Sequence, residues 1–232
     1  MATTLSSVPF DVAPYRFSGT VYGTLLNHRD ALEALGASVH EAPYKAPPKS
    51  VVLYVKPRNT LAGPGDAVEV PADAPELEVG PSLGLVIGRT ACRLSEAQAL
   101  DHVAGCVIVA DISVPHASFY RPQVRYKAGD GFCPIGPRVV RLDELGDLGR
   151  LAIRVHVDGR LVHESSTAGW IRSPARLLAE ITDFMTLAPG DILMTGVPHG
   201  APRVRAGQRS AIEIDGLGRL ENRFVAMAGA AP

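Results

Sequence analysis

Short apolar runs separated by glycine and proline are the feature that most constrains how this chain can fold. The sequence contains 23 glycines and 19 prolines, spread along its length, and both residue types mark turns and strand ends. Apolar runs of about four to eight residues suit strands better than helices. The runs predict strands at residues 20–26, 50–55, 83–87, 106–110, 138–142, 151–157, 192–195, 210–214 and 220–225.

Three stretches have helical spacing instead. The third of them begins with Ser173 and Pro174, which read as an N-cap and a proline at the first helical position. Leu177, Leu178 and Ile181 then fall on one face of that helix. The expected helices are residues 29–35, 95–103 and 174–184. Together with the strands they predict a β-rich α+β fold with a few short helices.

Proline marks the expected domain boundary. The segment 41–49 contains three prolines, which favour an extended backbone. We therefore expect a small N-terminal appendage and linker over residues 1–48 and a main domain over residues 49–225. Residues 226–232, rich in alanine and glycine, are expected to form a flexible tail.

Charge and apolar content argue against several classes of partner. The formal net charge is −1, from 23 basic and 24 acidic side chains, so neither nucleic acid nor an anionic membrane is expected as a partner. No apolar stretch approaches the roughly 20 residues that span a bilayer, and no signal peptide is visible, so we expect a cytoplasmic protein. Cys92, Cys106 and Cys133 are isolated from one another and indicate neither a disulfide framework nor a zinc site.

Three separated motifs carry a family resemblance. They are VAGCVIVADIS at 103–113, KAGDGFCPIGP at 127–137 and PGDILMTGVPHG at 189–200, followed by GLGRLEN at 216–222. In order and spacing they resemble the fumarylacetoacetate hydrolase family over roughly residues 49–225. The resemblance implies a mixed β-roll, often dimeric.

Four further stretches resemble one subgroup of that family. They are LNHR at 26–29, APYKAPPK at 42–49, KPRNT at 56–60 and SFYRP at 118–122. The subgroup is the N-terminal half, or separately encoded first subunit, of bifunctional isomerase/decarboxylases of 4-hydroxyphenylacetate breakdown. It implies enolate chemistry on small oxo-di/tricarboxylates: decarboxylation of 5-oxopent-3-ene-1,2,5-tricarboxylate and isomerisation of 2-hydroxyhepta-2,4-dienedioate.

The family's metal site transfers only in part. The resemblance implies Mg²⁺ or Mn²⁺ held by a Glu-x-Glu pair and an Asp, and Asp111 falls on that Asp. The two glutamate positions fall on Gly80 and Ser82, which supply no carboxylate. Glu76 and Glu78 lie four residues too early, roughly 13 Å along a strand, unless a bend folds them back. Asp111 is therefore either a ligand or else a relic or local hydrogen-bond acceptor, and in the second case the metal is absent from this chain alone.

Several residues are candidates for holding substrate. The resemblance places Lys127 on the family's substrate-binding, catalytic lysine, and Thr195 with Gly196 on a loop that donates to a substrate carboxylate. Arg121 and Arg125 flank the same pocket if Lys127 does. The alternatives are a surface lysine, a strand-end hydroxyl and solvated loop arginines.

Acid/base residues are less well defined. The resemblance implies a histidine and a nearby glutamate in a short lid, but the histidine position falls on Ala31. His28, three residues earlier, and Glu33 are the catalytic candidates, with a surface role as the alternative for His28. His199 either contacts substrate or supports its loop. His116 follows Asp111 and is expected to be an exposed loop residue.

These observations lead to three hypotheses. The first is an isomerase/decarboxylase subunit that works in a homodimer or in a heterodimer with a homologous, metal-bearing subunit. The second is a non-catalytic structural protomer of that complex. The third is a self-sufficient hydrolase or decarboxylase of a related oxo acid.

Overall fold

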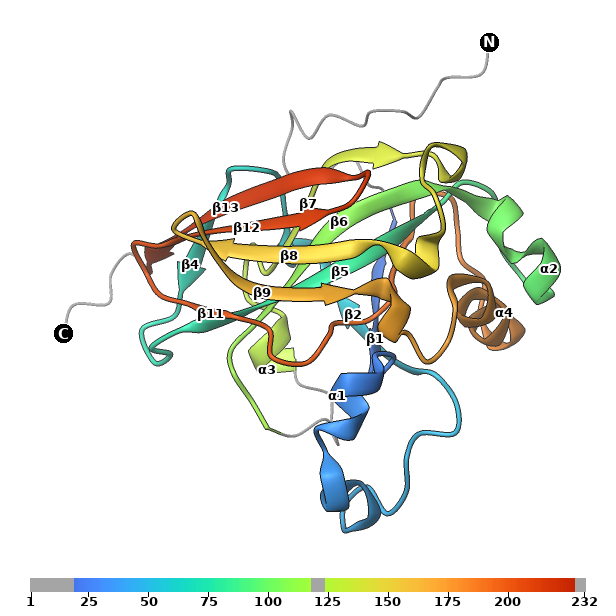
Figure 1. Ribbon diagram of the computed structural model, residues 1–232, viewed down its shortest axis with the longest axis horizontal. Helices are drawn as coiled ribbons and strands as arrows, with labels where there is room; N and C mark the ends of the chain where they lie inside the picture. Colours follow the sequence, from blue (N-terminus) through green and yellow to red (C-terminus); the bar gives the residue numbers. More distant parts are fainter. Residues whose placement is uncertain (1–18, 118–123, 228–232) are drawn as a thin grey trace.

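Two packed β-sheets make up most of the protein, shown as a ribbon in Figure 1. The computed structural model describes residues 19–117 and 124–227. The strands are β1 (Val21–Leu25), β2 (Val52–Lys56), β3 (Leu61–Ala62), β4 (Ala67–Val70), β5 (Leu77–Ile87), β6 (Val103–Ser113), β7 (Cys133–Val140), β8 (Ala152–Val157), β9 (Arg160–Ser166), β10 (Ile192–Met194), β11 (Arg203–Val204), β12 (Arg209–Ile214) and β13 (Gly218–Ala226). The α-helices are α1 (Arg29–Glu33), α2 (Glu96–Ala99), α3 (Val124–Lys127) and α4 (Pro174–Phe184). The 3₁₀ helices are η1 (Gly36–His40), η2 (Arg58–Thr60), η3 (Leu100–His102), η4 (Leu142–Glu144), η5 (Leu148–Arg150) and η6 (Thr167–Gly169).

Both sheets are mixed. The larger has the order β2-β1-β10-β5-β6-β7-β3, with β11 added beside β5, and the smaller has the order β4-β13-β12-β8-β9. Parallel pairs join β1 to β10, β3 to β7 and β4 to β13, and the other pairs are antiparallel. The predicted β-rich α+β fold with a few short helices is confirmed.

The core lies between the two sheets, where β12 and β13 cross β5 and β6 (Figure 1). Leu85 and Ile108 of the larger sheet and Ile212 and Phe224 of the smaller one belong to one buried cluster. Successive strand residues point to opposite faces, so each strand offers one apolar row to this layer. The stacked sheets bury the apolar residues of β5 and β6, and these two strands carry the site described below.

Helix α4 packs its apolar face against the same core. Ser173 caps it by accepting a hydrogen bond from the Arg176 amide, and Leu177, Leu178 and Ile181 are fully buried. This helix has the predicted bounds. Among the described residues, no helix is long and apolar enough to cross a membrane.

Other elements differ from their expected bounds. The helix expected over 95–103 is split into α2 and η3, and β6 begins at Val103. The strand expected over 138–142 begins at Cys133. Strands β3, β4, β9 and β11 were not expected, since they are very short or mostly polar. The expected N-terminal appendage, residues 1–48, supplies β1, which lies inside the larger sheet between β2 and β10.

The length of β5 decides the geometry of the site. It runs unbroken through Gly80 and Ser82, with Glu78 opposite Ser113 and Gly80 opposite Asp111 of β6. Strands β5 and β6 are paired along this stretch, and Asp111 lies within β6, not after the end of the strand predicted over residues 106–110. Because β5 stays paired along this stretch, no bend folds Glu78 back toward the expected metal positions.

Candidate functional site

A pocket with a volume of about 420 Å³ opens beside β5 and β6. Strand residues Glu78, Gly80, Asp111 and Ser113 line one wall. Apolar residues of α1 and of the segment before it, together with the loop 197–201 after β10, form another part of the lining; these apolar residues are Leu25, Leu26, Ala31, Ala34 and Leu35. The pocket therefore combines charged strand residues with apolar ones.

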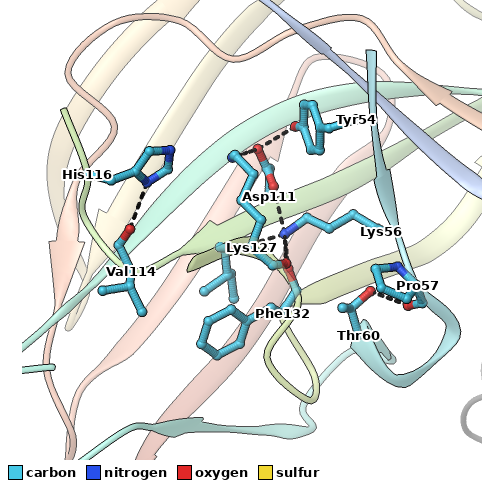
Figure 2. A network of polar contacts seen from close by, with 10 residues as sticks. Tyr54, Lys56, Pro57, Thr60, Asp111, Val114, His116, Lys127 and Phe132 are labelled. Carbon is cyan, nitrogen blue, oxygen red and sulfur yellow. Dashed lines mark hydrogen bonds and ion pairs between the residues drawn. The ribbon is translucent and has the colours of Figure 1, made fainter. Parts of the chain in front are cut away.

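Asp111 is the centre of the polar network at the base of this pocket (Figure 2). Its side chain is 3% exposed. Oδ2 accepts hydrogen bonds from Lys127 Nζ at 2.7 Å and from the Tyr54 hydroxyl at 2.5 Å. Oδ1 lies 2.8 Å from Lys56 Nζ. One carboxylate is thus held by two ammonium groups and one phenol.

Lys56 closes the network from below. The residue is 1% exposed, and its ammonium donates to the carbonyls of Ile112 at 2.7 Å, Lys127 at 2.8 Å and Phe132 at 2.9 Å. These three bonds use all three ammonium hydrogens, so the contact with Asp111 Oδ1 is an ion pair without a directed hydrogen. Burial lowers the pKa of Lys56, and the Asp111 charge opposes that shift.

Electrostatics keep the base of the pocket ionised. Burial alone would raise the pKa of Asp111, but the ammonium groups of Lys127 and Lys56 hold it well below its usual range. Burial and the Asp111 charge raise the pKa of Tyr54 well above its ordinary value. The carboxylate therefore stays charged, and the phenol stays protonated as its donor.

Lys127 is the ammonium group of this network that lies on the pocket side. It ends α3, its side chain is 12% exposed, and it lines the pocket. Its ammonium also lies 4.7 Å from the centroid of the Tyr54 ring, a cation–π distance. Asp111 is its one hydrogen-bond acceptor within the described residues, which leaves N–H bonds for a ligand.

The side chains present do not fit a divalent metal ion. No three His, Cys, Asp or Glu side chains of the described residues come together as ligands. A Cβ at Gly80 would lie 2.9 Å from Val197 Cγ1 and 3.0 Å from the Asp111 carbonyl. Ser82 is buried and donates to the Gly196 carbonyl at 3.0 Å. Because Mg²⁺ and Mn²⁺ need several oxygen ligands, and Asp111 is already balanced by two ammonium groups, the site lacks a suitable donor set.

Glu76 and Glu78, the alternative metal ligands, lie in different environments. Glu76 pairs with Arg203 at 2.8 Å and Arg205 at 3.6 Å. Glu78 lines the pocket. The Glu-x-Glu pair therefore does not act as one unit.

Thr195 and Gly196 lie beneath the pocket. The Thr195 hydroxyl donates to the Leu83 carbonyl at 3.0 Å, and neither residue belongs to the pocket lining. Gly196 has a φ of 117°, a backbone conformation that favours glycine. The two residues shape the start of the loop whose next residues, from Val197 to Ala201, line the pocket.

The structure does not bring the two expected acid/base residues to the pocket. The His28 ring is buried, contacts Asp30, and lies 3.0 Å from the Ser166 carbonyl through Nε2. A Cβ at Gly169 would lie 2.1 Å from that ring, so the ring packs directly on the backbone there. Glu33 is exposed on α1 and lies outside the lining.

The remaining candidates are divided between the pocket and the surface. His199 lines the pocket, and its amide donates to Asp30 Oδ1 at 3.1 Å. His116 also lines the pocket, stacked on Tyr126 with ring centroids 5.4 Å apart, contrary to the expectation of an exposed loop residue. Arg125 is an exposed partner of Asp73, away from the lining. Arg121 lies outside the described residues.

Sequence reasoning missed Tyr54, Lys56 and Arg203. A signal existed for Lys56, because it ends an apolar run and opens the KPRNT motif. A lysine carried into the core by such a run needs an anionic partner, which would have directed attention to a buried carboxylate such as Asp111. Tyr54 sits two residues before it, hence on the same strand face. Arg203 lies on a two-residue strand, for which no pattern is detectable.

Comparison with known proteins agrees with the fold. Residues 20–225 match the family described as fumarylacetoacetate (FAA) hydrolase, C-terminal. The 4-hydroxyphenylacetate degradation bifunctional isomerase/decarboxylase of Escherichia coli is 37% identical over 207 residues, which are 89% of this chain and 47% of that protein. A mitochondrial oxaloacetate tautomerase of Xenopus laevis is 33% identical over 188 residues, 77% of this chain and 59% of that protein. The chain thus spans about half the length of the bifunctional relative.

Solved structures show the same architecture. A 5-carboxymethyl-2-hydroxymuconate delta-isomerase from Mycobacterium smegmatis superposes with a TM-score of 0.75 at 28% identity, over 90% of this chain and 80% of that one. A maleylpyruvate hydrolase from Sphingobium sp. SYK-6, in complex with manganese(II) and pyruvate, gives a TM-score of 0.72 at 27% identity, over 89% and 70%. Because the family match extends over residues 20–225, this chain belongs to the fumarylacetoacetate hydrolase family.

Proposed function

We propose that this chain is a subunit of an isomerase/decarboxylase of 4-hydroxyphenylacetate catabolism that binds small oxo-di/tricarboxylates in the pocket above Asp111. The observation that carries the proposal is the Lys127 ammonium, which is fixed on a buried carboxylate and has N–H bonds directed to no other described residue. The activities named for the 33–38% identical relatives support the same chemistry.

Both proposed reactions pass through one dienolate. In decarboxylation, the C–C bond to the departing carboxylate breaks, its electron pair moves through the neighbouring double bond to the oxo oxygen, and carbon dioxide leaves. In isomerisation, the 2-hydroxyl loses its proton and C5 gains one. Negative charge collects on the same oxygen in each case, and the Lys127 ammonium stabilises it there.

Glu78 is the proposed proton-transfer group in place of His28 and Glu33. Its carboxylate lines the pocket and makes no hydrogen bond or ion pair to another described residue. Burial raises its pKa, although Lys127, His116 and Arg203 act in the opposite direction. The 2-hydroxyl gives its proton to a water molecule, a neutral Glu78 then gives its proton to C5 of the dienolate, and the water returns a proton to the Glu78 carboxylate.

A homologous, metal-bearing partner completes this proposal. The donor set around Asp111 does not fit a divalent ion, so the ion belongs to the partner subunit. The chain spans 47% of its bifunctional relative, so that relative contains a further stretch of about the same length. The two units form a heterodimer, with a homodimer as the alternative.

Reconstitution tests the proposal. The chain, a homologous subunit that carries the Glu-x-Glu pair and Asp, and their complex would each be assayed for both reactions with Mg²⁺ or Mn²⁺. We expect turnover by the complex, and Lys127→Met in this chain should lower it about 100-fold. Arg125→Met, an exposed change outside the pocket, is the matched control and should leave the rate unchanged.

Two outcomes would favour the other hypotheses. Full activity of a complex with Lys127→Met would indicate a non-catalytic structural protomer. Enzyme-like turnover by the chain alone, with stoichiometric Mn²⁺ bound, would indicate a self-sufficient hydrolase or decarboxylase of a related oxo acid.

A further inference from the structure

The pocket wall carries a second cation at some distance from Lys127. Arg203 of β11 is in register with Glu78 of β5, which is in register with Ser113 of β6. All three residues line the pocket. Asp111, where the Lys127 ammonium is bound, lies two strands from Arg203 and two residues further along. Strand spacing and rise place the Cα atoms of Arg203 and Asp111 roughly 12 Å apart.

The guanidinium of Arg203 has one edge available. Its Nη1 donates to Glu76 Oε1 at 2.8 Å. Its Nε and Nη2 make no hydrogen bond within the described part of the chain. Nε and Nη2 form the side-on fork that binds a carboxylate through two parallel hydrogen bonds. Glu76 therefore orients the arginine without using this fork.

Glu78 divides the wall between the two cations. It lies on β5, the strand between β11, which carries Arg203, and β6, which carries Asp111 and its partner Lys127. A substrate carboxylate placed at the middle of this wall would face the Glu78 carboxyl group and no cation. The two cations, with no third cation between them on this wall among the described residues, favour an elongated molecule with an anionic group at each end.

We propose that Arg203 recognises the second carboxylate of the substrate and that the pocket selects oxo acids with a carboxylate at both ends. Lys127 holds the 2-oxo acid end, and the Nε–Nη2 fork of Arg203 holds the far carboxylate. The inference rests on the proposed function for its substrate class and adds the residue that sets the specificity.

A binding measurement tests this proposal without turnover. Calorimetric titration of the full chain would compare 2-oxoheptanedioate with 2-oxoheptanoate, which has the same length but lacks the second carboxylate. We expect the diacid to bind about 10-fold more tightly. Arg203→Met should remove this preference by weakening diacid binding alone, and Arg203→Lys should restore part of it.

Arg205→Met is the matched control. Arg205 contacts the same Glu76 but lies outside the pocket lining, so its loss should change neither affinity. If Arg203→Met weakened both acids equally, or neither, the specificity role of Arg203 would be wrong while the proposed function stood. If neither acid bound the unchanged chain, the proposed function would fail along with it.

Discussion

The two lysines that hold Asp111 occupy contrasting regions. Lys56 lies in a sealed floor, where each ammonium hydrogen meets a carbonyl oxygen. Lys127 lies on the open side, where it lines the pocket. Burial makes the first lysine dependent on its partners for folding, while access makes the second available to a ligand. Lys56 thus stabilises the fold on one side of the carboxylate, and Lys127 is accessible to a ligand on the other.

Removing the floor lysine should have the largest effect. Lys56→Met leaves three carbonyls and the Asp111 carboxylate without their cation, and we expect the free energy of unfolding to fall by about 3–5 kcal/mol. Lys127→Met, the matched change on the open side, should cost less, about 1.5–3 kcal/mol, because Lys56 and Tyr54 still contact the Asp111 carboxylate. Urea denaturation measures both variants. Equal losses would erase the distinction between the floor and the open side.

The pH dependence of the free energy of unfolding should follow the titration of Asp111, the carboxylate that both lysines contact. Because the pKa of Asp111 is lower in the folded chain, its charge stabilises the fold above the unfolded pKa of about 4. That contribution is lost as pH falls through the folded pKa. Asp111→Asn should therefore cost about 3 kcal/mol at pH 7, with the difference shrinking below about pH 4. A difference independent of pH in denaturation curves would contradict this account.

A substitution of Glu78 tests the pocket side of the site through enzyme activity. Glu78→Gln should lower isomerisation by the reconstituted complex about 10-fold to 100-fold. Since burial raises the pKa of Glu78, its acid form persists to higher pH, and wild-type activity should decline as pH rises through that pKa. The variant should lack this decline. Glu33→Gln, on the exposed face of α1, serves as the control. A larger loss of activity in Glu33→Gln than in Glu78→Gln would indicate that Glu33 transfers the proton.

Thiol labelling tests whether the region around Lys56 is closed to solvent, and the smallest effect is expected there. Burial raises the pKa of both Cys133, beside Lys56, and Cys106 to about 12, so both thiols stay neutral and shielded at pH 8. Cys92 is exposed. Ellman's reagent should titrate one thiol in the native chain and three after unfolding. Rapid labelling of Cys133 would show that the floor opens.

Strand lengths in the centre of the sheet were harder to predict than strand positions. The apolar runs at 83–87 and 106–110 correctly marked β5 and β6, but each strand has 11 residues. Gly80 and Asp111 look like strand ends when only local preferences are considered. Pairing between the two strands extends both of them through these residues, because a neighbouring ladder satisfies the backbone whatever the side chain is.

The candidate site was predicted in part. Asp111 and Lys127 were identified through family motifs, and the structure joins them directly. Tyr54 and Lys56 were missed, since they approach Asp111 from β2, more than 50 residues earlier. His28 lies beside the expected lid in sequence, yet its ring packs on Gly169. Closeness along the chain was a poor guide to closeness in the pocket.

The sequence by itself determined the β-rich class, the capped α4 helix, the family motifs and the loss of carboxylates at Gly80 and Ser82. These properties depend on local spacing and residue chemistry, which require no knowledge of distant contacts. Only the tertiary structure decided that Lys56 seals Asp111 from below and that Glu78 and Arg203 face the pocket. Strand register decided these contacts, because a shift of one residue would turn every side chain of a strand to its other face.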